Sequence, residues 1–195
     1  ILAAAALAHD IGNPPFGHAG EDAISRFFKR NPVGETVLAK MEPKQQADLL
    51  AFEGNAQAFR VLTKLQNPNN RGGLQLSLPV IASIIKYPCA SYAKPKESNV
   101  AYKKFNYFQA ESELFHAFAK RAGLEAHPEC QGAWFRHPFA YLLEAADDIC
   151  YHLVDLEDAY RLSLLSGKKV MGFFRDIITS NNRFPDKRMA TITRE

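Results

Sequence analysis

The apolar residues of this chain recur at helical spacing, and no segment sustains the apolar–polar alternation of a β-strand. The longest periodic segment runs from His137 to about Ser166, opens near Pro138 and is closed by Gly167. We therefore predict an all-α fold with one hydrophobic core. Shorter helices are expected over residues 1–10, where the helix should be buried, and over 18–30, 42–65 (interrupted around Gly54), 78–87 and 109–122.

Composition places the chain among ordinary globular proteins. Hydrophobic residues make up 47% and charged residues 23% of its 195 residues, which is close to the globular average and excludes a disordered or collagen-like chain. No run of about 18 apolar residues occurs, so we expect no membrane span and no membrane partner. Lysine and arginine number 24 against 21 acidic residues, an excess too small to require a nucleic-acid partner.

We expect a single domain over residues 1–195, with a motif-bearing core at about 1–166 and a tail at 167–195. Because the first residue is not Met and lies in an apolar segment, the chain is expected to be a fragment of a longer protein. The three cysteines are too few and too scattered for a disulfide framework, which favours a reduced, cytoplasmic compartment.

A loop rich in glycine and proline, residues 11–17, follows the first expected helix. Adjacent side chains on a helix point about 100° apart, so His9 and Asp10 can reach one point only at a helix end such as this one. An imidazole and a carboxylate that converge there make a candidate site for a divalent metal. The alternative is that both are ordinary surface or capping residues.

The helix expected after this loop carries His18 and Glu21 at positions i and i+3, which share one helix face. A carboxylate beside a histidine orients the imidazole ring and favours its charged form, as a catalytic base requires. The alternative is a first-turn glutamate that stabilises the helix dipole. Ile24, Phe27 and Phe28 are expected on the buried side of this helix.

The long helix presents Asp147, Tyr151 and Asp155 as a stripe at positions i, i+4 and i+8. A carboxylate on an otherwise apolar, alanine-lined helix is costly to bury unless it is paired or bound to metal, which favours a functional role for Asp147. Asp148 is expected to face solvent. The alternative is that the whole acidic set is a solvated face.

A basic stretch begins at the end of the helix expected over 78–87, with Lys86 and Tyr87. Residues 91–107, expected to be a surface excursion, continue it. Cations among aromatic residues suit phosphate binding and base stacking, although such stretches are usually solvated loops. No glycine-rich loop of the Walker type occurs, which argues against a P-loop nucleotidase. The residues concerned are Lys94, Lys96, Lys103, Lys104, Tyr92, Tyr102, Phe105, Tyr107 and Phe108.

Together these motifs resemble the deoxyguanosine triphosphate triphosphohydrolase (dGTPase) family, a branch of the HD superfamily of metal-dependent phosphohydrolases. The resemblance rests on four blocks in the family's order: residues 9–21, 52–57, 85–87 and 144–159. It implies an HD-domain helical bundle, seen here as a fragment of a longer chain.

The resemblance also implies roles for individual residues. His9, Asp10 and Asp147 would bind the metal, together with one more histidine from a helix upstream of this chain. His18 and Glu21 would be the catalytic pair, with His18 as base or as nucleophile. The residues implied to bind substrate are Lys86 at the phosphate oxygens, Tyr87 in the same pocket, Tyr151 and Asp155 at the deoxyribose, and Asn55, whose physical role is otherwise only to cap the following helix.

The reaction expected from the resemblance splits a deoxynucleoside triphosphate into deoxynucleoside and inorganic triphosphate. The mixed imidazole and carboxylate ligands suit Mn²⁺, Mg²⁺, Fe²⁺ or Co²⁺. We expect a homo-oligomer in the cytoplasm, with single-stranded DNA as a further candidate partner. The alternatives are another HD phosphohydrolase, such as a nucleotidase or phosphodiesterase, and a non-catalytic regulator that binds nucleotides or single-stranded DNA.

Overall fold

The computed structural model describes residues 1–93, 95 and 99–180. These residues form α-helices joined by loops and isolated β-bridges, without a β-strand, which confirms the predicted all-α class. The chain divides into two compact units, residues 1–145 and 146–195, and each is described by itself. The single domain expected over residues 1–195 therefore stays a prediction. No helix in the described ranges is long and apolar enough to cross a membrane.

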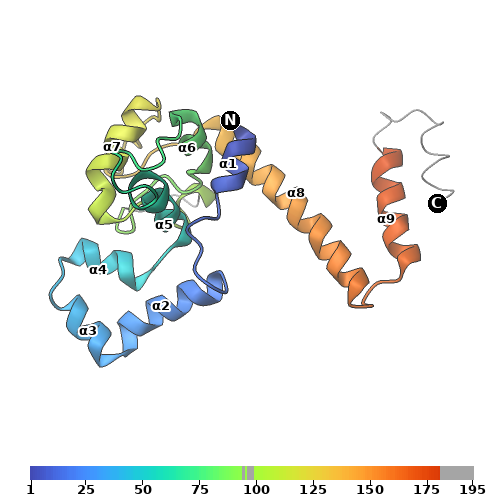
Figure 1. Cartoon of the computed structure of the whole chain (residues 1–195), viewed down its shortest axis with the longest axis horizontal. Coiled ribbons are helices and arrows are strands. Elements are labelled where there is room, and N and C mark those ends of the chain that lie inside the picture. Colours follow the sequence, from blue (N-terminus) through green and yellow to red (C-terminus); the bar gives the residue numbers. More distant parts are fainter. Residues whose placement is uncertain (94, 96–98, 181–195) are drawn as a thin grey trace. The chain divides into compact units, whose positions relative to one another are not determined.

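Among its described residues, the first unit contains seven α-helices and the beginning of an eighth (Figure 1). A π-helical turn, Val61–Leu65, extends the fifth helix, and two 3-10 turns precede the seventh. The second unit holds the rest of α8 and then α9, Gly167–Ser180. The bounds of the others are α1 Leu2–Ala8, α2 His18–Arg30, α3 Pro32–Leu38, α4 Pro43–Leu50, α5 Gly54–Arg60, α6 Leu78–Ile84, α7 Ser112–Arg121 and α8 Pro138–Arg161.

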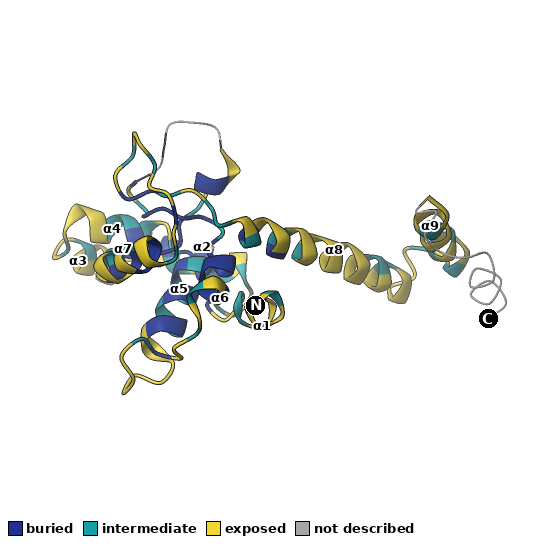
Figure 2. Cartoon of the chain, turned by 90° about the horizontal axis from the view of Figure 1, so that it is seen from above, coloured by how far each residue is buried: buried dark blue, intermediate teal, exposed yellow. Residues whose placement is uncertain are grey.

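The core of the first unit is built around α5, which is short but carries buried residues on several sides (Figure 2). Phe59 of α5 packs edge-on against Phe115 of α7 with ring centroids 5.1 Å apart. Phe115 in turn stacks on Tyr107 at 4.1 Å. Such aromatic pairs combine a large buried apolar area with favourable ring geometry. Helix α5 is therefore anchored in a buried aromatic cluster.

The segment expected to be a surface excursion, residues 91–107, contributes aromatic residues to the core at 101–107, and for these residues that expectation is wrong. Tyr102, Phe105 and Tyr107 are at most 4% exposed. The physical reason is that burial of the large apolar rings is strongly favourable, whereas the lysines between them need to keep only their charged ends in water. Lys103 is exposed, whereas Lys94 and Lys96 lie outside the described residues.

Three details of the expected helices also need correction. The first helix is not buried as a whole, because only Ala5 is buried and Leu7 is 91% exposed. In α2, Phe27 is exposed and Glu21 is buried. The Glu21 side chain turns inward and accepts a hydrogen bond from the N–H of Gly54 at the start of α5. The long helix ends at Arg161 and not at Gly167, which begins α9. Shortly after Arg161, Ser163 adopts a left-handed backbone conformation.

Two glycines allow the loop after α1 to lie directly on the start of α5. A Cβ at Gly12 would overlap the backbone nitrogen of Ala58 and the carbonyl oxygen of Gly54. A Cβ at Gly54 would lie 2.5 Å from Asn13 Oδ1 and 2.9 Å from Glu21 Oε1. Any side chain at either position would push the loop and α2 away from α5. The two glycines thus bring distant parts of the sequence to one place.

We expect Gly12→Ala to destabilise the first unit by about 1–3 kcal/mol, the range for overpacked cores, because backbone atoms must move to admit the methyl group. Urea denaturation would measure the loss. Gly172→Ala is the matched control, since Gly172 lies inside α9 with open space around it and alanine favours helix there. Equal stability of the Gly12 variant and the wild type would contradict the close approach.

Candidate active site

His18 and Glu21 face each other in the first turn of α2. The imidazole Nδ1 lies 2.8 Å from Glu21 Oε2, within hydrogen-bond distance. The His18 side chain is 85% exposed, whereas the Glu21 side chain is only 10% exposed. The pair therefore presents an accessible imidazole whose orientation is fixed from behind by a buried carboxylate. That is the arrangement a general base requires.

The Glu21 carboxylate is shared among three partners that come from different parts of the chain. Its Oε1 accepts a hydrogen bond from the Gly54 backbone N–H at 2.7 Å. Its Oε2, which bonds His18, also lies 3.6 Å from Lys104 Nζ. One side chain thus ties α2 to the start of α5 and to the segment before α7.

Burial by itself opposes the charged form of Glu21, but its partners outweigh burial. Hydrogen bonds from His18 and from the Gly54 N–H, with the positive charge of Lys104, hold the pKa of Glu21 below its ordinary value of 4.5. The carboxylate is therefore ionised at neutral pH and able to stabilise a positive charge on His18.

A second buried carboxylate, Glu53, completes this network. Its Oε1 lies 3.1 Å from Lys104 Nζ and accepts a hydrogen bond from Asn55 Nδ2 at 2.7 Å. Burial raises the pKa of Glu53, and its two partners only partly offset the effect. Burial disfavours the charged form of Lys104, but the attraction of the Glu53 and Glu21 carboxylates outweighs burial and raises the pKa of Lys104. Two glutamates thus share one ammonium group.

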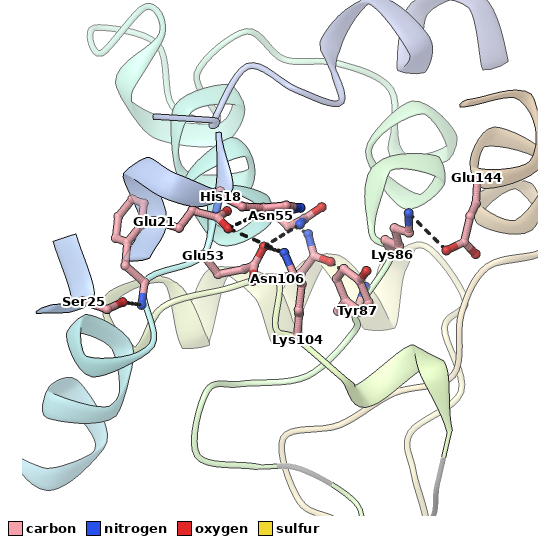
Figure 3. Close-up of polar contacts among 12 residues, drawn as sticks. His18, Glu21, Ser25, Glu53, Asn55, Lys86, Tyr87, Lys104, Asn106 and Glu144 are labelled. Atoms are coloured by element: carbon pink, nitrogen blue, oxygen red, sulfur yellow. Dashed lines mark hydrogen bonds and ion pairs between the residues drawn. The ribbon is translucent and has the colours of Figure 1, made fainter. Parts of the chain in front are cut away.

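Asn106 links this network to the Lys86–Tyr87 block (Figure 3). It is fully buried, and its Nδ2 donates to the Asn55 carbonyl oxygen at 3.1 Å. Its Oδ1 accepts from the Tyr87 N–H at 2.6 Å. Because both ends of the amide are bonded, the backbone at Tyr87 and the start of α5 are held at a fixed spacing. The expectation that Asn55 caps the following helix is wrong, because its amide bonds Glu53 instead.

Lys86 is paired with a residue of α8. Its Nζ lies 3.1 Å from Glu144 Oε1, and Figure 3 marks this ion pair with a dashed line. The other oxygen of Glu144 accepts from Arg136 Nη1 at 2.6 Å. Burial opposes ionisation of Glu144, but Lys86 and Arg136 outweigh it and lower its pKa. The predicted phosphate-binding lysine thus lies beside a carboxylate and a second cation.

His9 and Asp10 lie at the turn that ends α1, and their side chains approach each other. His9 Nε2 is 3.5 Å from Asp10 Oδ1, while Nδ1 lies 2.8 Å from the Ala6 carbonyl oxygen. Since a carbonyl only accepts, Nδ1 carries the proton, and in the neutral ring the lone pair is on Nε2, toward the carboxylate. The Nε2 lone pair of His9 and the carboxylate of Asp10 are ligands that suit a divalent cation. Within the described ranges, no group of three or more His, Cys, Asp or Glu residues is gathered for metal binding.

Asp147, Tyr151 and Asp155 belong to the second unit and lie on α8, where their spacing places them along one face of the helix. Asp147 is half-buried, and the other two are exposed. Asp148 is exposed, as expected. The roles implied for these three residues stay predictions.

Four residues of the site had no assigned role in the sequence analysis: Glu53 and Asn106 beside Glu21, and Arg136 and Glu144 beside Lys86. Two of them, Glu53 and Glu144, lie inside the blocks that carry the family resemblance. Lys104 was one of several loop cations, and nothing in its local spacing distinguishes it from Lys103. Only the fold separates them, because one faces water and the other lies between two glutamates.

Comparison with known proteins agrees with this arrangement of motifs. A deoxyguanosinetriphosphate triphosphohydrolase-like protein of Synechocystis is 45% identical over 174 residues, which cover 85% of this chain and 39% of the relative. A protein of the same description from Pseudomonas aeruginosa is 44% identical over 172 residues, covering 87% and 38%. A deoxyguanosinetriphosphate triphosphohydrolase of Yersinia enterocolitica is 33% identical over 192 residues, covering 85% and 35%. No protein-family model matches the chain.

These relatives show which family the all-α fold and its motifs represent. The chain belongs to the dGTPase family, and the predicted resemblance is confirmed. It spans less than two fifths of the length of the three relatives described above.

The charge of Glu21 should contribute to stability in a pH-dependent way. Its folded pKa is lowered, so this contribution is complete above the ordinary value of 4.5 and is lost as the pH falls through the folded pKa. Urea denaturation at several pH values should therefore show that Glu21→Gln costs most above pH 4.5 and less at lower pH. Asp22→Asn, which removes an exposed neighbouring carboxylate, is the control. The same pH course for Asp22→Asn would contradict the attribution to the buried network.

Proposed function

We propose that this chain forms part of the active centre of a metal-dependent hydrolase that splits a deoxynucleoside triphosphate into deoxynucleoside and inorganic triphosphate. The observation that carries the proposal is the exposed His18 imidazole, held from behind by a buried carboxylate that is itself bonded to Gly54. The names of the relatives support the same class of reaction.

In this proposal His18 is the general base. Its Nδ1–H donates to Glu21, so Nε2 is the nitrogen that takes a proton from the attacking water. The imidazolium that forms is stabilised at once by the Glu21 carboxylate, which remains ionised because of its partners. Lys104 and the Gly54 N–H hold that carboxylate in place and need not touch the substrate.

We assign the metal to His9, Asp10 and Asp147. A bound divalent cation would polarise the α-phosphate and offset the negative charge that develops there. Within the first unit, the Ala6 carbonyl fixes the His9 ring in the tautomer that metal binding requires. Mn²⁺, Mg²⁺, Fe²⁺ and Co²⁺ all suit these donors.

The remaining assignments concern the substrate and the partners. We assign Lys86 and Tyr87 to the polyphosphate, and Tyr151 and Asp155 to the deoxyribose, where an aromatic face excludes a 2′-hydroxyl and a carboxylate bonds the 3′-hydroxyl. Asn55, whose amide donates to Glu53, remains assigned to the substrate pocket as well. Assembly into a homo-oligomer, binding of single-stranded DNA and a cytoplasmic location are part of the same proposal.

Product analysis tests the reaction. The whole protein, incubated with each of the four deoxynucleoside triphosphates and Mn²⁺, should release inorganic triphosphate and a deoxynucleoside. We expect His18→Ala to lower kcat about 10²–10⁴-fold, the range for loss of a general base. Asp22→Asn, on the same helix but exposed, should retain activity. Release of orthophosphate alone would favour the nucleotidase alternative and contradict the proposed reaction.

Metal analysis tests the assigned ligands separately. Asp147→Ala should lose bound divalent metal and turnover together, because a carboxylate ligand is removed. Asp148→Ala changes the neighbouring exposed residue of α8 and should lose neither. Elemental analysis of both purified variants gives the metal content, and full metal content with normal turnover in the Asp147 variant would overturn this assignment.

A further inference from the structure

Glu144 bonds two cations at once. Its Oε1 lies 3.1 Å from Lys86 Nζ, and its Oε2 lies 2.6 Å from Arg136 Nη1. Arg136 is fixed in this position because its Nε donates to the Lys86 carbonyl oxygen at 2.6 Å. The two cations are therefore arranged around one acceptor by contacts within the first unit.

The guanidinium of Arg136 has a donor that Glu144 does not satisfy. The Arg136 side chain is only 3% exposed, and a guanidinium cannot give up its charge. Its Nη2 is buried and has no hydrogen-bond partner in the described part of the chain. Leaving a buried charged donor unpaired is costly, so the cluster has capacity for another acceptor oxygen.

A phosphate group meets these requirements better than a carboxylate does. It carries more negative charge and more acceptor oxygens, and arginine binds it in a bidentate manner. The guanidinium lies near the rings of Tyr87 and Tyr141, 5.8 and 5.2 Å from their centroids. These cation–π contacts keep it in place while its acceptor changes.

Glu144 is also able to leave. Its side chain is 22% exposed and stands near the start of α8, so a change of rotamer can take the carboxylate to solvent without breaking the backbone bonds of the helix. We propose that Glu144 occupies the place of a phosphate group between Lys86 and Arg136, and that a polyphosphate binds there by displacing it. This rests on the proposed function only in that the phosphate would belong to the substrate.

Titration calorimetry with inorganic tripolyphosphate, without added divalent metal, tests the proposal on the whole protein. We expect Glu144→Gln to bind about tenfold more tightly than the wild type, because a competing charged hydrogen-bond acceptor is removed. Glu144→Asp keeps the charge but is too short to bridge both cations, and it should also bind more tightly. Lys86→Gln and Arg136→Lys should bind several-fold more weakly.

Glu113→Gln is the matched control, because it removes an exposed carboxylate of α7 and should leave the affinity unchanged. Melting temperatures identify variants that do not fold. Wild-type or weaker affinity in both folded Glu144 variants would overturn the proposal, as would wild-type affinity in Lys86→Gln, which decides the matter if the Glu144 variants fail to fold. Tripolyphosphate binding involves no turnover, so failure here is distinguishable from failure of the proposed hydrolysis.

Discussion

The buried carboxylate of Glu21 is the contact on which the candidate site depends. It bonds an exposed imidazole on one side and the backbone of α5 on the other, so it ties α2 to the start of α5. The close approach has a steric condition, because Gly12 and Gly54 must both lack side chains. The Glu21 carboxylate and the absence of side chains at Gly12 and Gly54 together explain why motifs more than 30 residues apart in the sequence lie in contact.

The charges around Glu21 also explain how the site keeps an ionised carboxylate away from water. A lone buried carboxylate would take up a proton. Hydrogen bonds from His18 and the Gly54 N–H, together with the charge of Lys104, prevent this in Glu21. Lys104 is also shared with Glu53, whose own pKa is raised by burial. The network therefore keeps Glu21 ionised without cancelling its negative charge. A proton taken up by His18 then supplies a positive charge beside that carboxylate. Lys86, Arg136 and Glu144 form a second cluster, in which one carboxylate bonds two cations.

The sequence predicted the helical class and the pairing of His18 with Glu21, because both follow from local spacing on a helix. It did not predict that Tyr102, Phe105 and Tyr107 are core residues, since lysines between aromatic residues read as a solvated loop. Nor did it separate Lys104 from Lys103 or give Arg136 a role. The roles of those residues depend on contacts with segments 50 or more positions away, such as Lys104 with Glu53 and Arg136 with Lys86, and local periodicity carries no information about such contacts.

The most direct measurement of the central claim is ¹⁵N NMR of the His18 side chain, because the nitrogen shifts report which ring atom carries the proton. At a pH where the ring is neutral, the Glu21 contact predicts a proton on Nδ1 and a lone pair on Nε2. Replacing Glu21 by glutamine should release that preference. A neutral His18 protonated mainly on Nε2, with nitrogen shifts insensitive to the change at Glu21, would contradict the account.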